Sequence, residues 1–372
     1  MKDIFSLALI CEIAAEFRAV DISFDADAFI ARSMEGLNKL ELTGRAAHIA
    51  DAMRVYLPVR FAEAAAVIDA SLGPELPPTG KIGGAALRYM PHVLFVRKYG
   101  LDDYEAAMRV QAELTKRFTA EFSIRAFLVK YPERAYEQML VWADDDNAHL
   151  RRLASEGMRP RLPWAPRLRA FQHNPRPVIE LLERLRDDPV PYVRRSVANN
   201  LNDIAKDHPE LVIETCRRWA QEAPEGRTWI VRHALRSLVA TGNQDAIRIL
   251  GGAANPSIRL SGVAIAPQRV TLGGNTRVSF EVVSTAQQSQ RLLIGYTVHF
   301  VKANGSSRAK FFRLRTLTIH SGEKIALSAT VSLATMTTRH HFPGNHRIDA
   351  IINGEAHPLG NFEVITSMSV PA

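Results

Sequence analysis

The sequence contains little cysteine and no long apolar run. Only Cys11 and Cys216 occur among its 372 residues, and they lie far apart. This excludes a disulfide framework and a cysteine-rich zinc site, and it favours a reducing compartment, the cytoplasm. No apolar run reaches the roughly 18 residues that a membrane-spanning helix requires. With 47% hydrophobic and 23% charged residues, the chain is neither disordered nor collagen-like.

The motifs of several common enzyme classes are also absent. The sequence contains no Gly-x-Ser-x-Gly nucleophile motif and no His-Glu-x-x-His zinc motif. His340, His341 and His346 could bind a metal, but histidines clustered in a strand connection usually belong to the surface. The short apolar run at 4–10 before Cys11 continues at helical spacing, so we expect a first helix rather than an export signal. We therefore expect no metal, no cofactor and no membrane partner.

Two patterns of different period divide the chain. Before about residue 252, apolar residues recur at three- and four-residue spacing, as helices require. After that point, short β-branched segments alternate with turn pairs at 304–305, 321–322 and 353–354. The fold class is thus multidomain, α then β: a helical solenoid (1–255) followed by an immunoglobulin-like β-sandwich (256–372). We expect helices over 45–57, 60–68, 104–118 and 177–185, and strands over 278–283, 292–301, 311–319, 325–333 and 347–352.

The helical part repeats itself. A branched apolar residue followed by arginine recurs, and the intervals between these arginines are 26, 43 and 38 residues. The last two intervals fit helical-repeat periods, and each pair is expected to open a helix. The pattern is typical of HEAT-type helix pairs, which stack into a solenoid with a concave wall. The four pairs are Ile124-Arg125, Leu150-Arg151, Val193-Arg194 and Val231-Arg232.

One predicted helix, starting near Tyr192, is rich in residues that form helices poorly. Within five positions it contains Asn199, Asn200, Asn202 and Asp203. A solvated helix face would be more stable with Glu, Lys or Ala, so this cluster indicates function. The structural alternative is that these side chains cap or bridge neighbouring repeats.

Alignment of two repeats places charged residues on one wall. It sets Arg152 opposite Arg195 and Glu156 opposite Asn199. Arginines suit phosphate contacts, whereas a carboxylate beside DNA is repelled and needs a reason. The alternative is an ordinary i,i+4 ion pair between Arg152 and Glu156, worth about 0.2–0.5 kcal/mol.

Two further positions have both a structural and a functional interpretation. Glu121 begins a helix, where the helix dipole alone explains a carboxylate. Trp164 lies in a loop rich in arginine and proline, with Arg159 and Arg161, where it could stack on nucleic acid or pack beneath the loop.

The positive charge is concentrated at the C-terminal end. Of the net charge of +8, the segment from Pro256 onward contributes +7, from 12 Lys+Arg and 5 Asp+Glu. A basic domain suggests an acidic partner such as a nucleic-acid backbone, and the alternative is a soluble domain with a basic surface.

Three segments together resemble the HEAT-like-repeat DNA glycosylases, specifically the AlkC branch of bacterial alkylation repair. They are TAEFSIRAFLVKYPE (119–133), HLRRLASEGMRPRLPW (149–164) and SVANNLNDIAKDHPELV (196–212), and the resemblance covers roughly residues 35–250. A subset of the branch also carries a C-terminal immunoglobulin-like domain. The resemblance implies base excision repair of alkylation damage in double-stranded DNA by a monomer at the bacterial nucleoid. The expected reaction is hydrolysis of the N-glycosidic bond of small cationic bases, chiefly 3-methyladenine and alternatively 3-methylcytosine, on bent DNA without deep-pocket base flipping.

Residue by residue, the resemblance implies Asp203 as the principal carboxylate, with Glu156 and Glu121 selecting the cationic base and supporting water. It implies that Arg152 and Trp164 complete the cleft. Together with the basic residues of the wall and the loop, the expected DNA-binding set is Arg152, Trp164, Arg159, Arg161, Arg195 and Asn199.

Two other functions fit the same sequence. A HEAT scaffold that binds a protein predicts little effect of Asp203→Asn beyond stability, and a catalytically silent binder of damaged DNA predicts binding without turnover. Strong salt dependence of DNA binding separates the scaffold from the DNA functions. Only turnover separates the enzyme from the binder.

Overall fold

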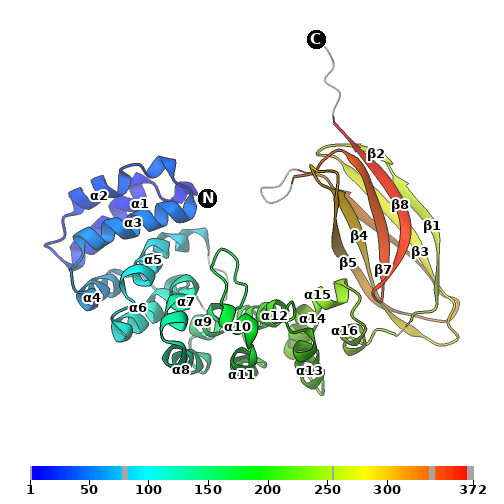
Figure 1. Cartoon of the computed structure of the whole chain (residues 1–372), viewed down its shortest axis with the longest axis horizontal. Helices are drawn as coiled ribbons and strands as arrows, with labels where there is room; N and C mark the ends of the chain where they lie inside the picture. Colours follow the sequence, from blue (N-terminus) through cyan, green and yellow to red (C-terminus); the bar gives the residue numbers. More distant parts are fainter. Residues whose placement is uncertain (1, 78–82, 254, 335–339, 367–372) are drawn as a thin grey trace, which may run out of the picture. The chain divides into compact units, whose positions relative to one another are not determined.

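The computed structural model describes residues 2–77, 83–253, 255–334 and 340–366. They form two compact units, Met1–Ala234 and Leu235–Ala372 (Figure 1). The first unit is helical, and the second contains two short helices and the strands. The expected order of a helical region followed by a β-sandwich is confirmed. The change from helix to strand falls between Ile249 and Ile258.

The helices of the first unit follow one another in chain order (Figure 1). Several begin at a side-chain cap, such as Ser6 before α1, Asp103 before α6 and Asn147 before α9. Short 3-10 helices span Lys2–Ile4, Leu37–Lys39 and Gly84–Tyr89. The α-helices are α1 (Leu7–Val20), α2 (Ala26–Met34), α3 (Leu42–Tyr56), α4 (Phe61–Ser71), α5 (Met90–Tyr99), α6 (Tyr104–Arg117), α7 (Glu121–Lys130), α8 (Pro132–Ala143), α9 (Ala148–Gly157), α10 (Arg169–His173), α11 (Arg176–Leu185), α12 (Pro191–Ile204), α13 (Pro209–Trp219) and α14 (Glu225–Ala234).

Alternate helices of this unit form two layers. Helices α3, α5, α7, α9, α12 and α14 contact one another in succession, and we call them the wall helices. Helices α4, α6, α8, α11 and α13 pack against them. The buried faces meet in an apolar core that includes Phe17, Phe95, Phe127 and Trp219. This is the stacking that a HEAT-like repeat requires, because a single helix pair cannot bury its own apolar face.

Two arginines of the repeat, Arg151 and Arg194, hold the turns that precede their wall helices. Arg151 Nη1 donates to the carbonyls of Asp145 and Asp146, at 2.9 and 2.8 Å. Arg194 Nη1 makes the equivalent bonds to the two residues of its own turn, at 2.7 and 2.8 Å. The prediction that Val231-Arg232 opens a helix is wrong, because α14 already begins at Glu225 and the pair lies near its end.

The second unit contains α15 (Arg236–Ala240), α16 (Gln244–Ile249) and two sheets. The sheets have the strand orders β1-β3-β6 and β2-β8-β7-β4-β5, and only β2 and β8 pair in parallel among the pairs described. Alternate residues of β3, among them Val278, Phe280 and Val282, enter an apolar core between them. The strands are β1 (Ile258–Ala266), β2 (Arg269–Thr271), β3 (Asn275–Ser284), β4 (Gln290–Val301), β5 (Ser307–Ile319), β6 (Lys324–Ser332), β7 (Gly344–Ile352) and β8 (Glu355–Ile365).

The predicted turns lie where the sequence placed them. Gly305, Gly322 and Gly354 have φ of 76°, 72° and 82°, and Asn353 has φ of 45°. Positive φ at both Asn353 and Gly354 is the geometry of a tight hairpin between β7 and β8.

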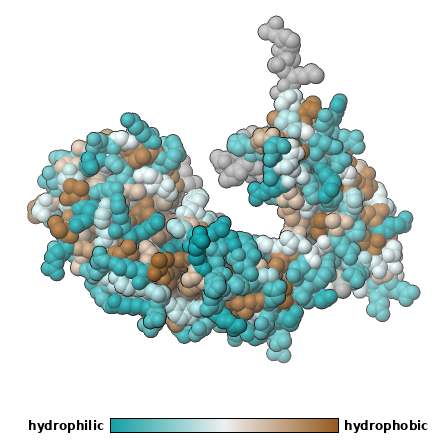
Figure 2. Space-filling view, viewed as in Figure 1, coloured by the Kyte–Doolittle hydropathy of each residue, from teal (hydrophilic) through white to brown (hydrophobic). Residues whose placement is uncertain are grey.

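The surface of the helical unit is mixed in character. Figure 2 shows hydrophilic side chains over much of the visible face, with smaller apolar areas between them. Within the described ranges, no helix is long and apolar enough to cross a membrane. The same ranges contain no group of three or more His, Cys, Asp or Glu residues that could hold a metal ion. His346 is buried and stacks on Phe362, with the ring centroids 5.1 Å apart.

Candidate active site

Six charged side chains of alternating sign meet along α7, α9 and α12, and we call them the charge ladder. Each side chain forms an ion pair with the next one in the series, and the five nitrogen–oxygen distances are 2.7, 3.5, 2.7, 2.8 and 2.8 Å. Glu121 begins α7, Arg152 and Glu156 belong to α9, Asp203 lies near the end of α12, and Arg159 and Lys206 follow α9 and α12 within two residues. The members in order are Glu121, Arg152, Glu156, Arg159, Asp203 and Lys206.

The carboxylates of the ladder are buried, and their exposed fractions are 9% for Glu121, 6% for Glu156 and 3% for Asp203. Burial alone would raise the pKa of Glu156, but the guanidiniums of Arg152 and Arg159 outweigh it and hold this pKa below its usual value. A hydrogen bond of 2.6 Å from the Ser196 hydroxyl acts in the same direction. The ladder therefore keeps a buried acid ionised.

The cations of the ladder are fixed by the same contacts. Burial would lower the pKa of Arg152, but Glu121 and Glu156 raise it above its usual value. The guanidinium also lies 5.1 Å from the ring centroid of Tyr192 and donates to the Thr119 hydroxyl at 3.1 Å. Breaking one partner of such a buried pair costs about 3–5 kcal/mol, so the geometry is rigid.

A cavity of about 300 Å³ opens beside the ladder, and we call it the carboxylate cavity. Glu121 and Glu156 line it, whereas Asp203 pairs with the lining residue Arg159 and is not itself among the lining residues. Oε2 of Glu121 accepts from Thr119 and Arg152, and Oε1 makes no hydrogen bond within the described part of the chain. The cavity thus presents two carboxylates, balanced by the two arginines that pair with them, among apolar and aromatic side chains, and an aromatic surface beside carboxylates suits a flat cationic ligand. Its remaining lining residues are Leu87, Met90, Phe118, Thr119, Phe122, Arg152, Arg159, Leu162, Pro163 and Trp164.

Trp164 forms part of the rim of this cavity. It is 74% exposed, which excludes the interpretation that it packs beneath its loop. Its φ is 63°, in the left-handed region that a tryptophan rarely adopts and that costs about 1–3 kcal/mol. The fold therefore holds a large apolar ring in solvent at an energetic cost, as expected of a side chain that contacts a ligand.

The loop that carries Trp164 is tied to α7 by a buried arginine. Arg125 donates four hydrogen bonds to backbone carbonyls, among them Gly157 at 3.0 Å, Arg159 at 2.7 Å and Pro166 at 3.2 Å. Burial lowers the pKa of Arg125 to about 10, which leaves the guanidinium charged at neutral pH. One side chain thus sets the position of both Arg159 and Trp164.

The asparagine-rich helix α12 contains both residues that bridge neighbouring repeats and residues that belong to the candidate site. Asn200 Nδ2 donates to the carbonyl of Ser155 in α9 at 2.7 Å, and Asn202 Nδ2 donates to that of Ala234 in α14 at 2.8 Å. These two residues bridge neighbouring repeats. Asp203 joins the charge ladder, and Asn199 lies on the wall with its Oδ1 3.2 Å from His233 Nε2.

The other residues that the sequence predicted for DNA binding lie outside the charge ladder. Arg161 pairs with Asp207, with its Nε 3.0 Å from Oδ2, and so lies at the end of α12. Arg195 is exposed on α12, and no ion pair to it is present within the described ranges. The structure therefore brings Glu121, Arg152, Glu156, Arg159, Asp203 and Trp164 together and leaves Arg161, Arg195 and Asn199 at the margin.

Sequence reasoning missed four residues that support the site. Arg125 follows the repeat pattern, but nothing in the sequence shows that it turns toward the 157–166 loop. Ser196, Tyr192 and Thr119 lie within a turn of predicted site residues, and that spacing is the only signal that could have identified them.

Comparisons with known proteins match both units. A family model described as "DNA alkylation repair enzyme" matches residues 117–238, which contain the whole charge ladder. A second, described as "Uncharacterised protein YhaZ, C-terminal Ig-like domain", matches residues 259–366. The chain is 33% identical over 365 residues to the uncharacterized protein YhaZ of Bacillus subtilis (strain 168), covering 98% of this chain and 99% of the relative.

A solved structure is similar over nearly the same length. It is the Pseudomonas fluorescens alkylpurine DNA glycosylase AlkC bound to DNA containing an abasic site analog. The TM-score is 0.90 and the sequence identity 35%, with 98% of this chain and 99% of that chain covered. Because sequence and fold agree along both units, this chain belongs to the AlkC family of DNA alkylation repair enzymes.

Proposed function

We propose that this protein is an alkylpurine DNA glycosylase that releases small cationic alkylated bases from double-stranded DNA. Its chief substrate is 3-methyladenine, and 3-methylcytosine is the second base to test. We place the activity in the cytoplasm at the nucleoid, where its substrate lies, and we propose that the protein acts as a monomer without a cofactor.

The observation that carries this proposal is the meeting of three buried carboxylates beside an aromatic-rimmed cavity. A surface that only bound DNA would need cations and no acids, because acids repel phosphates. Pairing within the charge ladder neutralises that repulsion and keeps Glu156 ionised. The acids therefore have a use other than binding the backbone.

That use follows from the chemistry of the lesion. An N3-alkylated adenine already carries positive charge and leaves as a neutral base, so no general acid is needed. The sugar that remains develops oxocarbenium character, as in glycoside hydrolysis. A carboxylate can stabilise this charge and orient the attacking water. Glu121 and Glu156 face the cavity and select the cationic base, with Trp164 and Phe122 against its ring.

We assign the sugar-stabilising role to Asp203. One of its oxygens is held by Arg159 and the other by Lys206, whose side chain is 45% exposed on the wall. A DNA phosphate competes with Asp203 for this lysine. If the Lys206 ammonium moves to a DNA phosphate, Oδ1 of Asp203 loses its partner. This oxygen then becomes available to the positive charge that develops on the sugar, and only when DNA is bound.

The sandwich supplies a second phosphate-binding surface. A cavity of about 560 Å³ lies at the end of the β4–β5 hairpin, and its described lining includes Lys302, Arg308, Lys310 and His340 and no carboxylate. Point cations around a concave surface suit a nucleic-acid backbone. We propose that this surface grips the backbone of bent DNA, which exposes the lesion without a deep pocket.

The test is release of 3-methyladenine from alkylated duplex DNA. We expect Asp203→Asn to reduce the rate by two orders of magnitude or more, as loss of a charge-stabilising group does. The matched control is Asp187→Asn, which removes an exposed carboxylate paired with Arg227 and should leave the rate unchanged. Thermal unfolding of both variants checks that they fold.

Each alternative gives a different result. Tight, salt-sensitive DNA binding by the wild-type protein without base release would overturn the glycosylase and leave a damage binder. Absence of salt-sensitive DNA binding would favour the protein scaffold.

A further inference from the structure

A second cavity lies on the other side of Trp164, and we call it the Arg97 cavity. It has a volume of about 590 Å³, within the range of roughly 300–1,000 Å³ that is usual for ligand sites. It shares Met90, Phe122 and Trp164 with the carboxylate cavity. Its other lining residues are Thr43, Gly44 and Ala47 of α3, Leu94, Arg97 and Lys98 of α5, and Pro166 of the loop.

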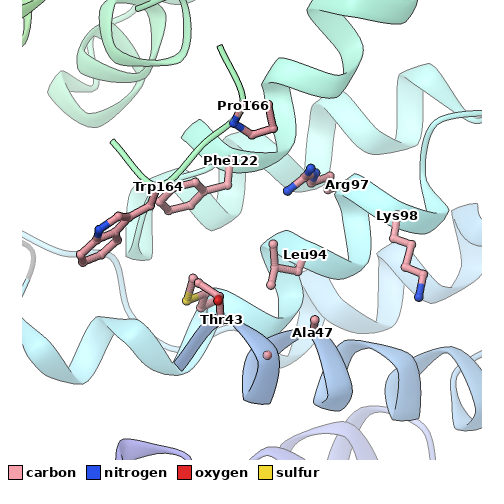
Figure 3. Close-up of a pocket in the computed structure, with 10 residues that line it drawn as sticks. Thr43, Ala47, Leu94, Arg97, Lys98, Phe122, Trp164 and Pro166 are labelled. Carbon is pink, nitrogen blue, oxygen red and sulfur yellow. The ribbon is translucent and has the colours of Figure 1, made fainter. Parts of the chain in front are cut away.

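The side chains of this cavity are arranged by type. Figure 3 shows Phe122, Trp164 and Pro166 along one side, Thr43 and Ala47 along the other, and Leu94 between them. Arg97 and Lys98 lie toward the end away from Trp164. The cavity is thus apolar along its length and cationic at one end.

Arg97 is the cation available to a ligand. It is exposed, and no ion pair to it is present in the part of the chain that the structure describes. Lys98 is instead held by Asp51 at 2.6 Å, and the Tyr99 hydroxyl donates to the same carboxylate. Among the described residues no carboxylate lines the cavity, and the charge of Asp51 is paired with Lys98, so a ligand anion can bind Arg97.

We propose that the Arg97 cavity binds an unstacked nucleotide of the DNA beside the lesion, with its phosphate on Arg97 and its base against Phe122 and Trp164. The ligand needs an anion at one end and a flat apolar part at the other, and a nucleotide has both. The apolar walls favour an unstacked nucleotide over a contact with the DNA backbone alone. A stacked duplex presents only phosphates and groove edges, and neither needs an apolar surface.

The inference rests on the proposed function, because continuity with the carboxylate cavity identifies the ligand as the same DNA. Bending DNA sharply unstacks a base step, and an aromatic surface beside the bend stabilises the exposed base. Stacking on an aromatic side chain stabilises an unstacked base whatever its identity, because every base has a flat face. Trp164 then separates two neighbouring nucleotides, the damaged one and the one beside it.

The test uses duplexes that contain an abasic-site analogue, so that binding is measured without turnover. 2-Aminopurine, whose fluorescence reports unstacking, replaces one base on either side of the lesion in each strand, in four separate duplexes. We expect the wild-type protein to change the fluorescence at one of these positions. Ala47→Phe, which fills the cavity from an exposed position on α3, should remove that change.

A second variant tests the phosphate. Arg97→Gln should lower the slope of log affinity against log salt by about 1, as loss of one phosphate contact does. Matched controls are Arg60→Gln, at the residue before α4, and Ala66→Phe on α4. They make the same changes at exposed positions outside the cavity and should alter neither readout. Thermal unfolding confirms that all four variants fold.

The outcomes are separable from those of the glycosylase test. If Ala47→Phe and the wild type give the same fluorescence at all four positions, the nucleotide subsite is overturned, even if base release is normal. If the wild type fails to release 3-methyladenine but Ala47→Phe still removes the fluorescence change, the glycosylase is overturned and the subsite stands. An unchanged salt slope for Arg97→Gln would contradict the assigned phosphate contact.

Discussion

The two cavities on either side of Trp164 share three residues and differ in their charged groups, because one is lined by two carboxylates paired with two arginines and the other by cations alone among the described residues. The carboxylate cavity contains Glu121 and Glu156, each already paired with arginine. The Arg97 cavity contains two cations and no acid. The charged groups of the first are held by a network of ion pairs, whereas no ion pair to Arg97 is present in the described part of the chain.

This difference shows where rigidity is needed. Under the proposed function, the carboxylates that select the cationic base must be ionised and in place before the base arrives, and the ion pairs of the ladder hold them there. A group that contacts a phosphate can remain mobile until the ligand arrives. The helices supply both from the same layer, since α7 contributes Phe122 to both cavities and Glu121 to only one.

The largest effect in this comparison is expected at Arg125, which holds the loop between the cavities. Arg125→Met leaves the carbonyls of Gly157, Arg159 and Pro166 without their donor. Each buried unsatisfied group costs about 1–3 kcal/mol, so we expect several kcal/mol of destabilisation and loss of base release. Chemical denaturation measures the first and the glycosylase assay the second.

Arg125→Lys is the informative companion variant. It retains the charge but cannot reach three carbonyls at once. If Arg125→Lys releases 3-methyladenine at the wild-type rate, the charge alone suffices and the tethering role is wrong.

An intermediate effect is expected from pH on the stability that Glu156, in the carboxylate cavity, contributes. The pKa of Glu156 is lowered in the folded protein, so its stabilising contribution is present above the unfolded value of about 4.3 and is lost as pH falls through the folded value. The difference in unfolding free energy between the wild type and Glu156→Gln should therefore be constant at neutral pH and narrow below about pH 4.

Arg97→Gln provides the contrast for that measurement. Because no carboxylate lines its cavity, this variant should show no such narrowing over the same range. Denaturant titrations at a series of pH values give both results. If the unfolding free energies of the wild type and Glu156→Gln differ by the same amount at every pH down to the most acidic one measured, the ladder does not hold Glu156 ionised.

The smallest effect on stability is expected at Trp164 itself. The positive φ favours glycine, so Trp164→Gly should be more stable than Trp164→Ala by about 1 kcal/mol. Both variants should lose base release and the fluorescence change together, because the ring borders both cavities. Equal stability of the two variants would mean that the backbone of this loop relaxes without the ring.

Much of the fold could be predicted from residue periodicity alone. Expected helices such as 104–118 and 177–185 coincide with α6 and α11 to within a residue or two. The expected strands over 292–301 and 347–352 lie within β4 and β7. Sequence patterns missed β1, β2 and β8. β8 contains Pro358 and Gly360 and exposes many of its side chains, so its alternation is weak.

The candidate site could be predicted only in part. The cluster of poor helix formers at 199–203 identified α12, and the repeat register placed Arg152 and Glu156 on the same wall. Glu121 depended on the family resemblance, because its position at a helix start has an ordinary explanation. The Arg97 cavity left no signal, because its residues come from three helices and a loop and none is unusual in its own segment.

The asparagine contacts of α12 have a mechanical consequence. Asn200 and Asn202 fasten α12 to α9 on one side and to α14 on the other through buried backbone carbonyls. A wall cross-linked in this way resists flexing between repeats, so under the proposed function the deformation is borne by the DNA. The persistence length of duplex DNA is about 150 base pairs, so a short site bends smoothly only at a high energetic cost. A local kink is then the easier way for the DNA to follow the protein surface. Damaged steps, which stack weakly, kink most readily, so the stiffness of these helices becomes a means of finding the lesion.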